Sequence, residues 1–153
     1  MTTLDDWLVA IHVLCAAIWV GGAFVTQLHA IRAQRGGAVA IGPFAKDSEF
    51  VGMRTFLPAS LILLGTGIWL VSRDVFQLEE WTVWGLIVIG LSIISGAGFL
   101  GPESGRIGQL SEERGEDDPE VQRRISRIFL VSRVELVLLI SVVLVMTLKP
   151  GAG

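Results

Sequence analysis

Residues 7–31 read WLVAIHVLCAAIWVGGAFVTQLHAI, and these 25 residues contain no Asp, Glu, Lys or Arg. As an α-helix, a segment of this length extends about 37 Å, which exceeds the ~30 Å hydrocarbon core of a bilayer. The stretch also holds both histidines, His12 and His29, and the only cysteine, Cys15. We expect a retained transmembrane helix here rather than a cleaved signal, because no basic segment precedes it.

Three more apolar segments follow, at residues 55–72, 81–100 and 128–148. The chain is 52% hydrophobic with a mean hydropathy of +0.64, which is above the level of an ordinary soluble domain. Its length suits one domain, residues 1–153. We therefore predict an all-α fold, a four-helix transmembrane bundle whose immediate partner is the lipid bilayer.

Glycine and proline mark the expected helix ends. Gly36-Gly37 ends the first helix, and Pro58 kinks the second. Gly101-Pro102 is expected to end the third helix, so that the charged residues 103–118 form mainly a solvated loop, with room for a short surface helix. The last helix starts at Asp118-Pro119, which supplies a capping side chain and a proline at the first position.

The basic residues predict the orientation. Of twelve Lys and Arg, nine lie in or beside the first and third connections, two lie on the other side, and Arg133 lies within the last helix. The positive-inside rule then places loops 1 and 3 in the cytoplasm and both termini outside, in a multi-pass protein of the plasma membrane, the inner membrane of a bacterium. Four of the five tryptophans are expected at the outer interface, where they would form an aromatic belt: Trp7, Trp69, Trp81 and Trp84. Trp19 lies near the middle of its span and does not belong to this belt.

His12 and Trp19 are the first candidate site. His12 lies roughly 7–8 Å inside the outer boundary, on one helix face with Trp19 and several small residues. A neutral imidazole there suits haem iron, copper or zinc, and a hydrogen bond that holds the bundle together is the alternative. His29 is roughly 25 Å away along the helix, so a second metal ligand has to come from another helix, and Met146 has a suitable depth.

A second candidate site is an intramembrane polar cluster. Arg133 and Glu135 lie within the last span, where unpaired charges are costly, and they point to opposite sides of the helix. Gln27, His29 and Arg54 have similar depths on other helices and are the expected partners. Such a cluster either fixes the helix register or forms a proton or ion path.

The sequence does not support a nucleotide site or a cysteine-rich metal site. The string GAGFLG at residues 96–101 matches a dinucleotide fingerprint in letters only, because it follows no strand and ends a membrane helix. We expect a glycine packing seam there, with no nucleotide and no nucleic acid as partner. A single cysteine also leaves no Cys-rich metal site.

The stretch IHVLCAAIWVGGAF, residues 11–24, resembles the first helix of a bacterial superfamily that includes copper-resistance-D domains and HemJ-type protoporphyrinogen oxidases. The whole chain is similar to a family of predicted integral membrane proteins of unknown function, through LPASLILLGTGIWLV, SGAGFLGPESGRI and DDPEVQRRISRI. The HemJ-type resemblance implies His12 as a ligand of haem b. The chain departs from that pattern, since its two lysines, Lys46 and Lys149, lie at or beyond the surface.

Three functions remain open at this point, and whether the protein is an enzyme remains open too. The first is binding of haem or a related tetrapyrrole through His12, in a redox or cofactor-handling role. The second is an oligomeric permeation unit for ions, protons or small solutes around Glu135. The third is a non-catalytic scaffold subunit of a larger membrane complex.

Overall fold

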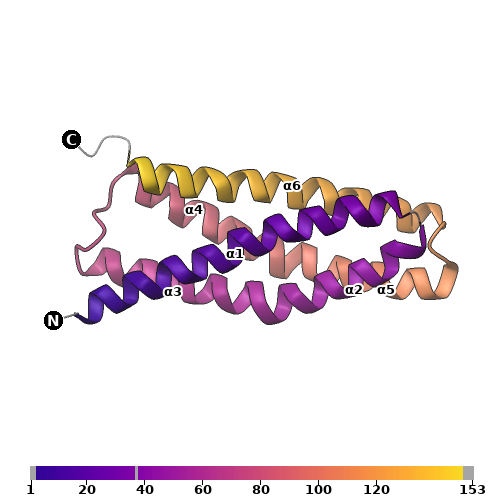
Figure 1. Ribbon diagram of the computed structural model, residues 1–153, viewed down its shortest axis with the longest axis horizontal. Helices are drawn as coiled ribbons and strands as arrows, with labels where there is room; N and C mark the ends of the chain where they lie inside the picture. The colour runs from indigo at the N-terminus through magenta and orange to yellow at the C-terminus, as the bar shows by residue number, and fades with distance from the viewer. Residues whose placement is uncertain (1–2, 37, 150–153) are drawn as a thin grey trace.

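The computed structural model describes residues 3–36 and 38–149, and nearly all of them are helical. Four membrane-length helical rods lie side by side along one axis (Figure 1). The rods are α1 (Leu4–Arg35); α2 (Ile41–Val51), η2 (Gly52–Phe56) and α3 (Leu57–Ser72); α4 (Glu80–Ser95), η3 (Gly96–Leu100) and α5 (Gly101–Arg114); and α6 (Pro119–Leu148). A short 3-10 turn, η1 (Ala38–Ala40), precedes α2. The predicted all-α four-helix membrane fold is confirmed.

The bundle has two distinct ends. The end that carries the start of α1, the end of α6 and residues 73–79 is called the proximal end below (Figure 1). The end that carries η1 and residues 115–118 is called the distal end. A rod of 32 residues extends about 48 Å, which is longer than the ~30 Å hydrocarbon core, so part of each rod projects beyond the lipid.

Two helix starts follow the expected capping chemistry. At α1, the Thr3 backbone N–H donates to Asp6 Oδ2 at 2.7 Å, and the Asp6 N–H donates to Thr3 Oγ1 at 3.3 Å. At α6, the Glu120 N–H donates to Asp118 Oδ1 at 2.8 Å, which confirms the predicted start at Asp118-Pro119. Each carboxylate thus satisfies an N–H that has no partner within its helix.

The prediction that Gly101-Pro102 ends the third helix is wrong. The rod continues through Pro102 to Arg114, so the charged segment is mostly helix α5 rather than loop. In a regular α-helix the proline ring would clash with the carbonyl four residues earlier. The wider π-helical turn η3, closed by the Gly101 N–H donating to the Gly96 carbonyl, lies directly before Pro102 and relieves this clash.

The same device occurs in the second rod. The π-helical turn η2 is closed by the Leu57 N–H donating to the Gly52 carbonyl, and Pro58 follows directly. Each π-turn starts at a glycine that lies six residues before the proline, in GMRTFLP and GAGFLGP. The two turns contact each other across the bundle. Pro58 therefore sits in a continuous rod directly after a π-turn, and the kink that the sequence predicts there stays a prediction.

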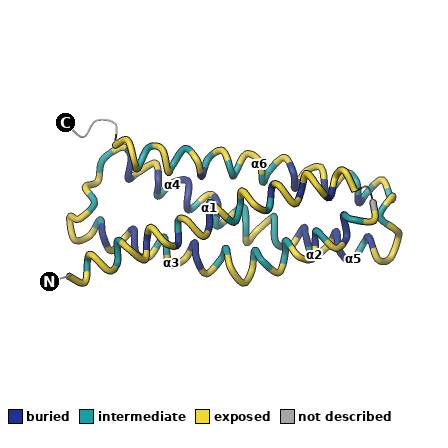
Figure 2. The backbone as a smooth tube through the Cα atoms, in the orientation of Figure 1, coloured by how far each residue is buried: buried dark blue, intermediate teal, exposed yellow. Residues whose placement is uncertain are grey.

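Buried residues form two clusters on the inward faces of the rods (Figure 2). The distal cluster consists of Ala30, Ile41, Ala45, Ile107, Val121, Ile125, Ile128 and Phe129. The other cluster lies nearer the middle and consists of Trp19, Val88, Ile89 and Leu139. Large apolar side chains such as Ile94, which is 70% exposed, cover much of the outer surface, as expected where lipid is the solvent.

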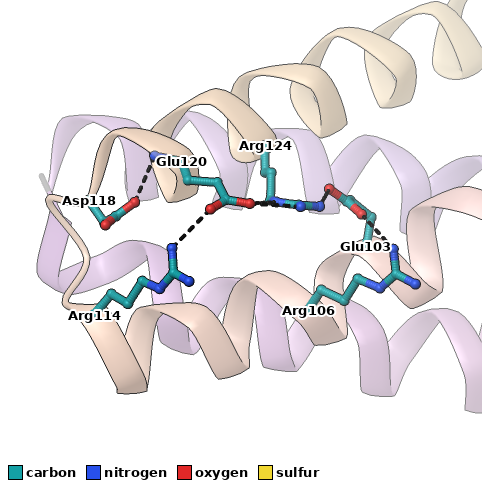
Figure 3. A network of polar contacts seen from close by, with 6 residues as sticks. All are labelled: Glu103, Arg106, Arg114, Asp118, Glu120 and Arg124. Carbon is teal, nitrogen blue, oxygen red and sulfur yellow. Dashed lines mark hydrogen bonds and ion pairs between the residues drawn. The ribbon is translucent and has the colours of Figure 1, made fainter.

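Charged residues at the distal end form a network between α5 and α6 (Figure 3). Arg124 donates to Glu103 Oε1 at 2.7 Å and to Glu120 Oε1 at 2.9 Å, and Arg114 reaches Glu120 Oε2 at 3.0 Å. These groups precede the apolar span of α6. The hydrogen bond from Arg124 holds the pKa of Glu120 below its usual value, and the same bond raises the pKa of Arg124.

Candidate functional site

The histidine predicted as a ligand is held by a hydrogen bond to a neighbouring helix. His12 of α1 is buried, and its Nδ1 lies 2.9 Å from Thr66 Oγ1 of α3. The Thr66 hydroxyl has a single hydrogen, which it donates to the helix carbonyls of Ile62, at 2.8 Å, or Leu63, at 3.1 Å. With that hydrogen on either carbonyl, the hydroxyl oxygen can only accept from His12 Nδ1–H, and this tautomer leaves the lone pair on Nε2.

His12 lines a cavity of about 360 Å³ between α1, α3, α4 and α6, called the proximal cavity below. Its walls are mainly apolar and include Trp19, Trp81 and Met146. In residues 3–36 and 38–149, no hydrogen bond reaches His12 Nε2, while Nδ1 is engaged by Thr66. The histidine therefore contributes one unpaired lone pair to an apolar chamber.

Aromatic and basic side chains complete the proximal end of this cavity. The Phe76 ring packs edge-on against His12 at 5.7 Å and against Trp81 at 6.0 Å between centroids. Trp81 is fixed by its indole N–H, which donates to Glu79 Oε2 at 2.6 Å. Lys149 Nζ lies 5.3 Å from the Trp81 ring centroid and also lines the cavity. An apolar chamber with one cation near its end suits a flat apolar ligand that carries an acidic group.

Two glycines make room for the candidate ligands. A Cβ at Gly67 would lie 3.2 Å from His12 Cε1, which is a crowded contact. A Cβ at Gly85 would lie 2.3 Å from Met146 Cε. Both positions are buried within the apolar rods. The small residues therefore let the side chains of α1 and α6 lie against facing helices.

A second cavity, of about 120 Å³, lies next to the two π-turns and is called the distal cavity below. Glu135 of α6, Gln27 of α1 and Ser92 of α4 line it. Gln27 Nε2 donates to Ser132 Oγ at 2.7 Å. Trp19 lines both cavities and therefore forms the wall between them.

The structure brings together only part of the predicted polar cluster. Gln27 and Glu135 share the distal cavity, whereas His29, Arg54 and Arg133 are exposed outside it. The Arg54 guanidinium lies over the Phe50 ring at 5.0 Å, and Arg133 Nη2 donates to Gln34 Oε1 at 3.4 Å. Within the described chain, Glu135 forms no ion pair with any of them.

Several residues that matter here did not stand out in the sequence. Thr66 resembles any small polar residue in an apolar helix, and its only signal is the surrounding GTG at residues 65–67. Trp81, predicted as part of the aromatic belt, is buried and lines the proximal cavity, and its depth in the membrane stays a prediction. Ser92 lies in an apolar helix with no local signal of a site, and it lines the distal cavity. Their roles depend on contacts between rods, which spacing within one helix does not show.

Four apolar rods of membrane length, with two internal cavities between them, define a multi-pass integral membrane protein. The chain belongs to the family described as predicted integral membrane protein (DUF2269), which matches residues 6–150. This confirms the resemblance to a family without known activity, and it does not show similarity to copper-resistance-D domains or HemJ-type oxidases. Comparisons with curated proteins and with solved structures found no match.

Proposed function

We propose that the protein binds haem, or a related tetrapyrrole, in the proximal cavity through His12, in a redox or cofactor-handling role. The observation that carries this proposal is the 2.9 Å hydrogen bond between His12 Nδ1 and Thr66 Oγ1, which leaves Nε2 without a partner among the described residues; with Thr66 donating to its own helix, the Nε2 lone pair is available to a metal. Metal-ligating histidines commonly have this arrangement, because the second hydrogen bond fixes the tautomer and orients the ring.

The other residues of the cavity support the same ligand. Met146 lines the chamber from α6, and histidine with methionine is an established pair of axial haem ligands. The aromatic walls suit a flat apolar ring, and Lys149 offers a cation to a carboxylate. A volume of about 360 Å³ falls within the range of small-molecule and cofactor pockets.

Each side chain has a distinct task in this proposal. Thr66 orients the imidazole, and the rings of Trp19, Phe76 and Trp81 keep water away from it. When bound, haem supplies one-electron chemistry, and an apolar surrounding together with the axial ligands adjusts its potential. Protoporphyrinogen oxidation is no part of this proposal.

The test is an absorption spectrum of the full chain purified in mild detergent, before and after addition of haemin. We expect a Soret band that His12→Ala abolishes and that Met146→Leu shifts. His29→Ala, which removes the exposed histidine of the same helix, serves as the control and should leave the band unchanged. A colourless preparation after haemin addition, or a band that survives His12→Ala, would contradict the proposal.

Two glycines of α3 allow a finer version of this test. Gly67→Ala places a methyl group about 3.2 Å from His12 Cε1, whereas Gly65→Ala meets nothing within 4 Å. We expect the first substitution to displace the imidazole and weaken haem binding, and the second to have no effect. Equal haem binding by the two variants would show that the position of the imidazole does not matter.

A permeation unit around Glu135 is the second candidate function. The observation in its favour is that the two cavities lie one after the other along the bundle and share Trp19 as a wall. Trp19→Ala should then raise solute or proton flux into liposomes, and Glu135→Gln should lower it. Flux that neither substitution changes would exclude this function.

A further inference from the structure

The distal cavity has an unbalanced charge. Among the described residues that line it, Glu135 is the only ionisable side chain, and no lysine, arginine or histidine faces it. Glu135 lies within the apolar span of α6 and is only partly exposed. A carboxylate in such surroundings is costly unless a proton or a positive partner neutralises it. The cavity therefore offers a place for a positive charge that the chain itself does not provide.

Two oxygen atoms beside Glu135, on Gln27 and Ser92, have acceptor capacity that the described residues leave unused. Gln27 uses its Nε2 to donate to Ser132, so its carbonyl oxygen Oε1 remains available. Ser92 Oγ is fully enclosed, and within residues 3–36 and 38–149 no hydrogen bond of standard geometry reaches it; its polar neighbour is the Glu135 carboxylate. A buried hydroxyl without a partner loses about 1–3 kcal/mol, so its presence points to a missing ligand or water. A group with several N–H donors would satisfy both oxygens together with the carboxylate.

The walls and the size of the cavity indicate the kind of cation. Trp19, Phe56 and Phe129 line it with aromatic rings, whose faces attract organic cations. The volume of about 120 Å³ is close to that of cavities of about 150 Å³ that hold benzene. A divalent metal needs several oxygen ligands and usually more than one carboxylate. A small organic ammonium fits these walls better than a bare metal ion does.

The two π-turns shape the cavity and its opening. Gly52 and Met53 of η2 line it on one side, and Gly96 and Ala97 of η3 line it on another. Met53 and Ala97 are exposed, so the lining reaches the outer surface between the turns. π-Helical turns within α-helices are frequent at functional sites, because they displace side chains from the regular helix spacing.

We propose that the distal cavity is a binding site for a small protonated amine, with the ammonium group against Glu135, Ser92 and Gln27 and the alkyl part against the aromatic walls. The site is separate from the proximal cavity and does not depend on haem. Its ligand donates hydrogen bonds to the three oxygens and supplies the positive charge that the lining lacks.

The experiment is calorimetric titration of the full chain in detergent with n-butylammonium chloride, at constant ionic strength in sodium chloride. We expect saturable binding that Glu135→Gln weakens about tenfold or more, because a charged hydrogen bond contributes about 1.5–3 kcal/mol. Ser92→Ala should weaken binding less. Glu80→Gln, the same change at an exposed carboxylate of α4, is the matched control and should leave the affinity unchanged.

Two further titrations distinguish a protonated amine from an uncharged ligand and from a metal ion. n-Butanol, which has a similar shape but no charge, should bind at least tenfold more weakly. Equal binding of n-butanol, or binding that Glu135→Gln leaves intact, would overturn the proposal in favour of an apolar pocket. Saturable binding of sodium in a sodium-free buffer, with no binding of the amine, would overturn it in favour of a metal ion. If Glu135→Gln does not fold, Glu135→Asp, which keeps the charge but shortens the side chain, should still reduce the affinity.

Discussion

The proximal and distal halves of the bundle are built from the same four rods but handle polar groups differently. In the proximal half, α1, α3, α4 and α6 surround a cavity of about 360 Å³, and the buried His12 is paired with a neutral hydroxyl. In the distal half, π-turns interrupt two rods, the cavity is about 120 Å³, and charged side chains form ion pairs between α5 and α6.

The difference follows from the solvent around each half. Surrounded by lipid, a polar group has to find its partner inside the protein, and a neutral hydrogen bond such as that of His12 meets this need at low cost. Beyond the hydrocarbon core, water and counter-ions are available, so Glu103, Glu120 and Arg124 can be charged. Glu135 belongs to neither case, which is why its cavity stands out.

The largest loss in the free energy of unfolding is expected for a substitution in the distal cluster. Ile107 is completely buried there, whereas Ile94 is 70% exposed on the outer surface. Ile107→Ala should lower the free energy of unfolding by about 2–5 kcal/mol, because it leaves a cavity, and Ile94→Ala should change it by less than about 1 kcal/mol. Unfolding of both variants in mixed micelles, followed by circular dichroism, measures this. Similar losses would mean that the distal cluster is not a core.

The next effect concerns the ion pairs of the distal half. Arg124→Met leaves the buried Glu103 without its 2.7 Å partner and should cost about 1.5–3 kcal/mol. Lys46→Met breaks only an exposed pair with Glu112 and should cost at most about 1 kcal/mol. The double variant Glu103→Gln/Arg124→Met should recover part of the loss. Equal effects of the two single substitutions in the same unfolding assay would contradict the distinction between buried and exposed pairs.

A smaller loss in the free energy of unfolding is expected at the contact between Gly22 of α1 and Phe56, where the two halves meet. A Cβ at Gly22 would lie 2.4 Å from Phe56 Cε1 in the π-turn η2, whereas a Cβ at Gly21 meets nothing within 4 Å. Gly22→Ala should therefore push the Phe56 ring into the distal cavity and cost about 1–2 kcal/mol, while Gly21→Ala should be neutral. Amine binding should fall for the first variant only. Unchanged binding by Gly22→Ala would show that Phe56 does not shape the cavity.

The smallest effect should appear on acidification. Arg124 depresses the pKa of Glu120 in the distal half, and Thr3 depresses that of Asp6 at the proximal end. A carboxylate whose pKa is lower in the folded than in the unfolded protein stabilises the folded state. This stabilisation is fully present above the unfolded pKa, near 4.5 for Glu120 and 3.8 for Asp6. It is lost as the pH falls through the lower pKa of the folded state.

Comparison of Glu120→Gln and Asp6→Asn with the parent protein tests this. Each deficit in unfolding midpoint should be present at pH 7 and should shrink below about pH 4. Salt should reduce the deficit of Glu120→Gln, because its partner is a charged guanidinium, and should affect Asp6→Asn less, because its donors are neutral. A deficit that stays constant from pH 7 to pH 3 would contradict these pairings.

Much of the fold was predictable because it depends on local signals. Long apolar segments predict the four rods, and Asp118 and Pro119 predict the start of α6, since caps act within one turn. Gly101-Pro102 misled the prediction, because proline normally ends a helix and nothing local distinguishes a π-turn from a stop. Whether a helix continues past such a proline depends on packing against another rod, which here is α2 against α5.

The candidate sites were predictable to a lesser degree. His12 and Trp19 share a helix face, as their spacing predicts, and both line the proximal cavity. Thr66, which sets the tautomer of His12, lies 54 residues away in the chain. Depth alone suggested His29 and Arg54 as partners of Glu135, but depth does not tell which side of a rod a residue occupies. Both residues are exposed outside the distal cavity.

The two π-turns also give the chain some tolerance in its own length. A π-turn holds one residue more than a regular α-helical turn, so a one-residue deletion within residues 52–56 can close η2 to an α-helical turn and leave α2 and α3 facing as before. The same deletion within the regular helix α3 has no extra residue to remove, and it would rotate the helix on one side of the cut by about 100° relative to the other. The position of a one-residue deletion therefore decides whether the face that α2 presents to α5 is kept.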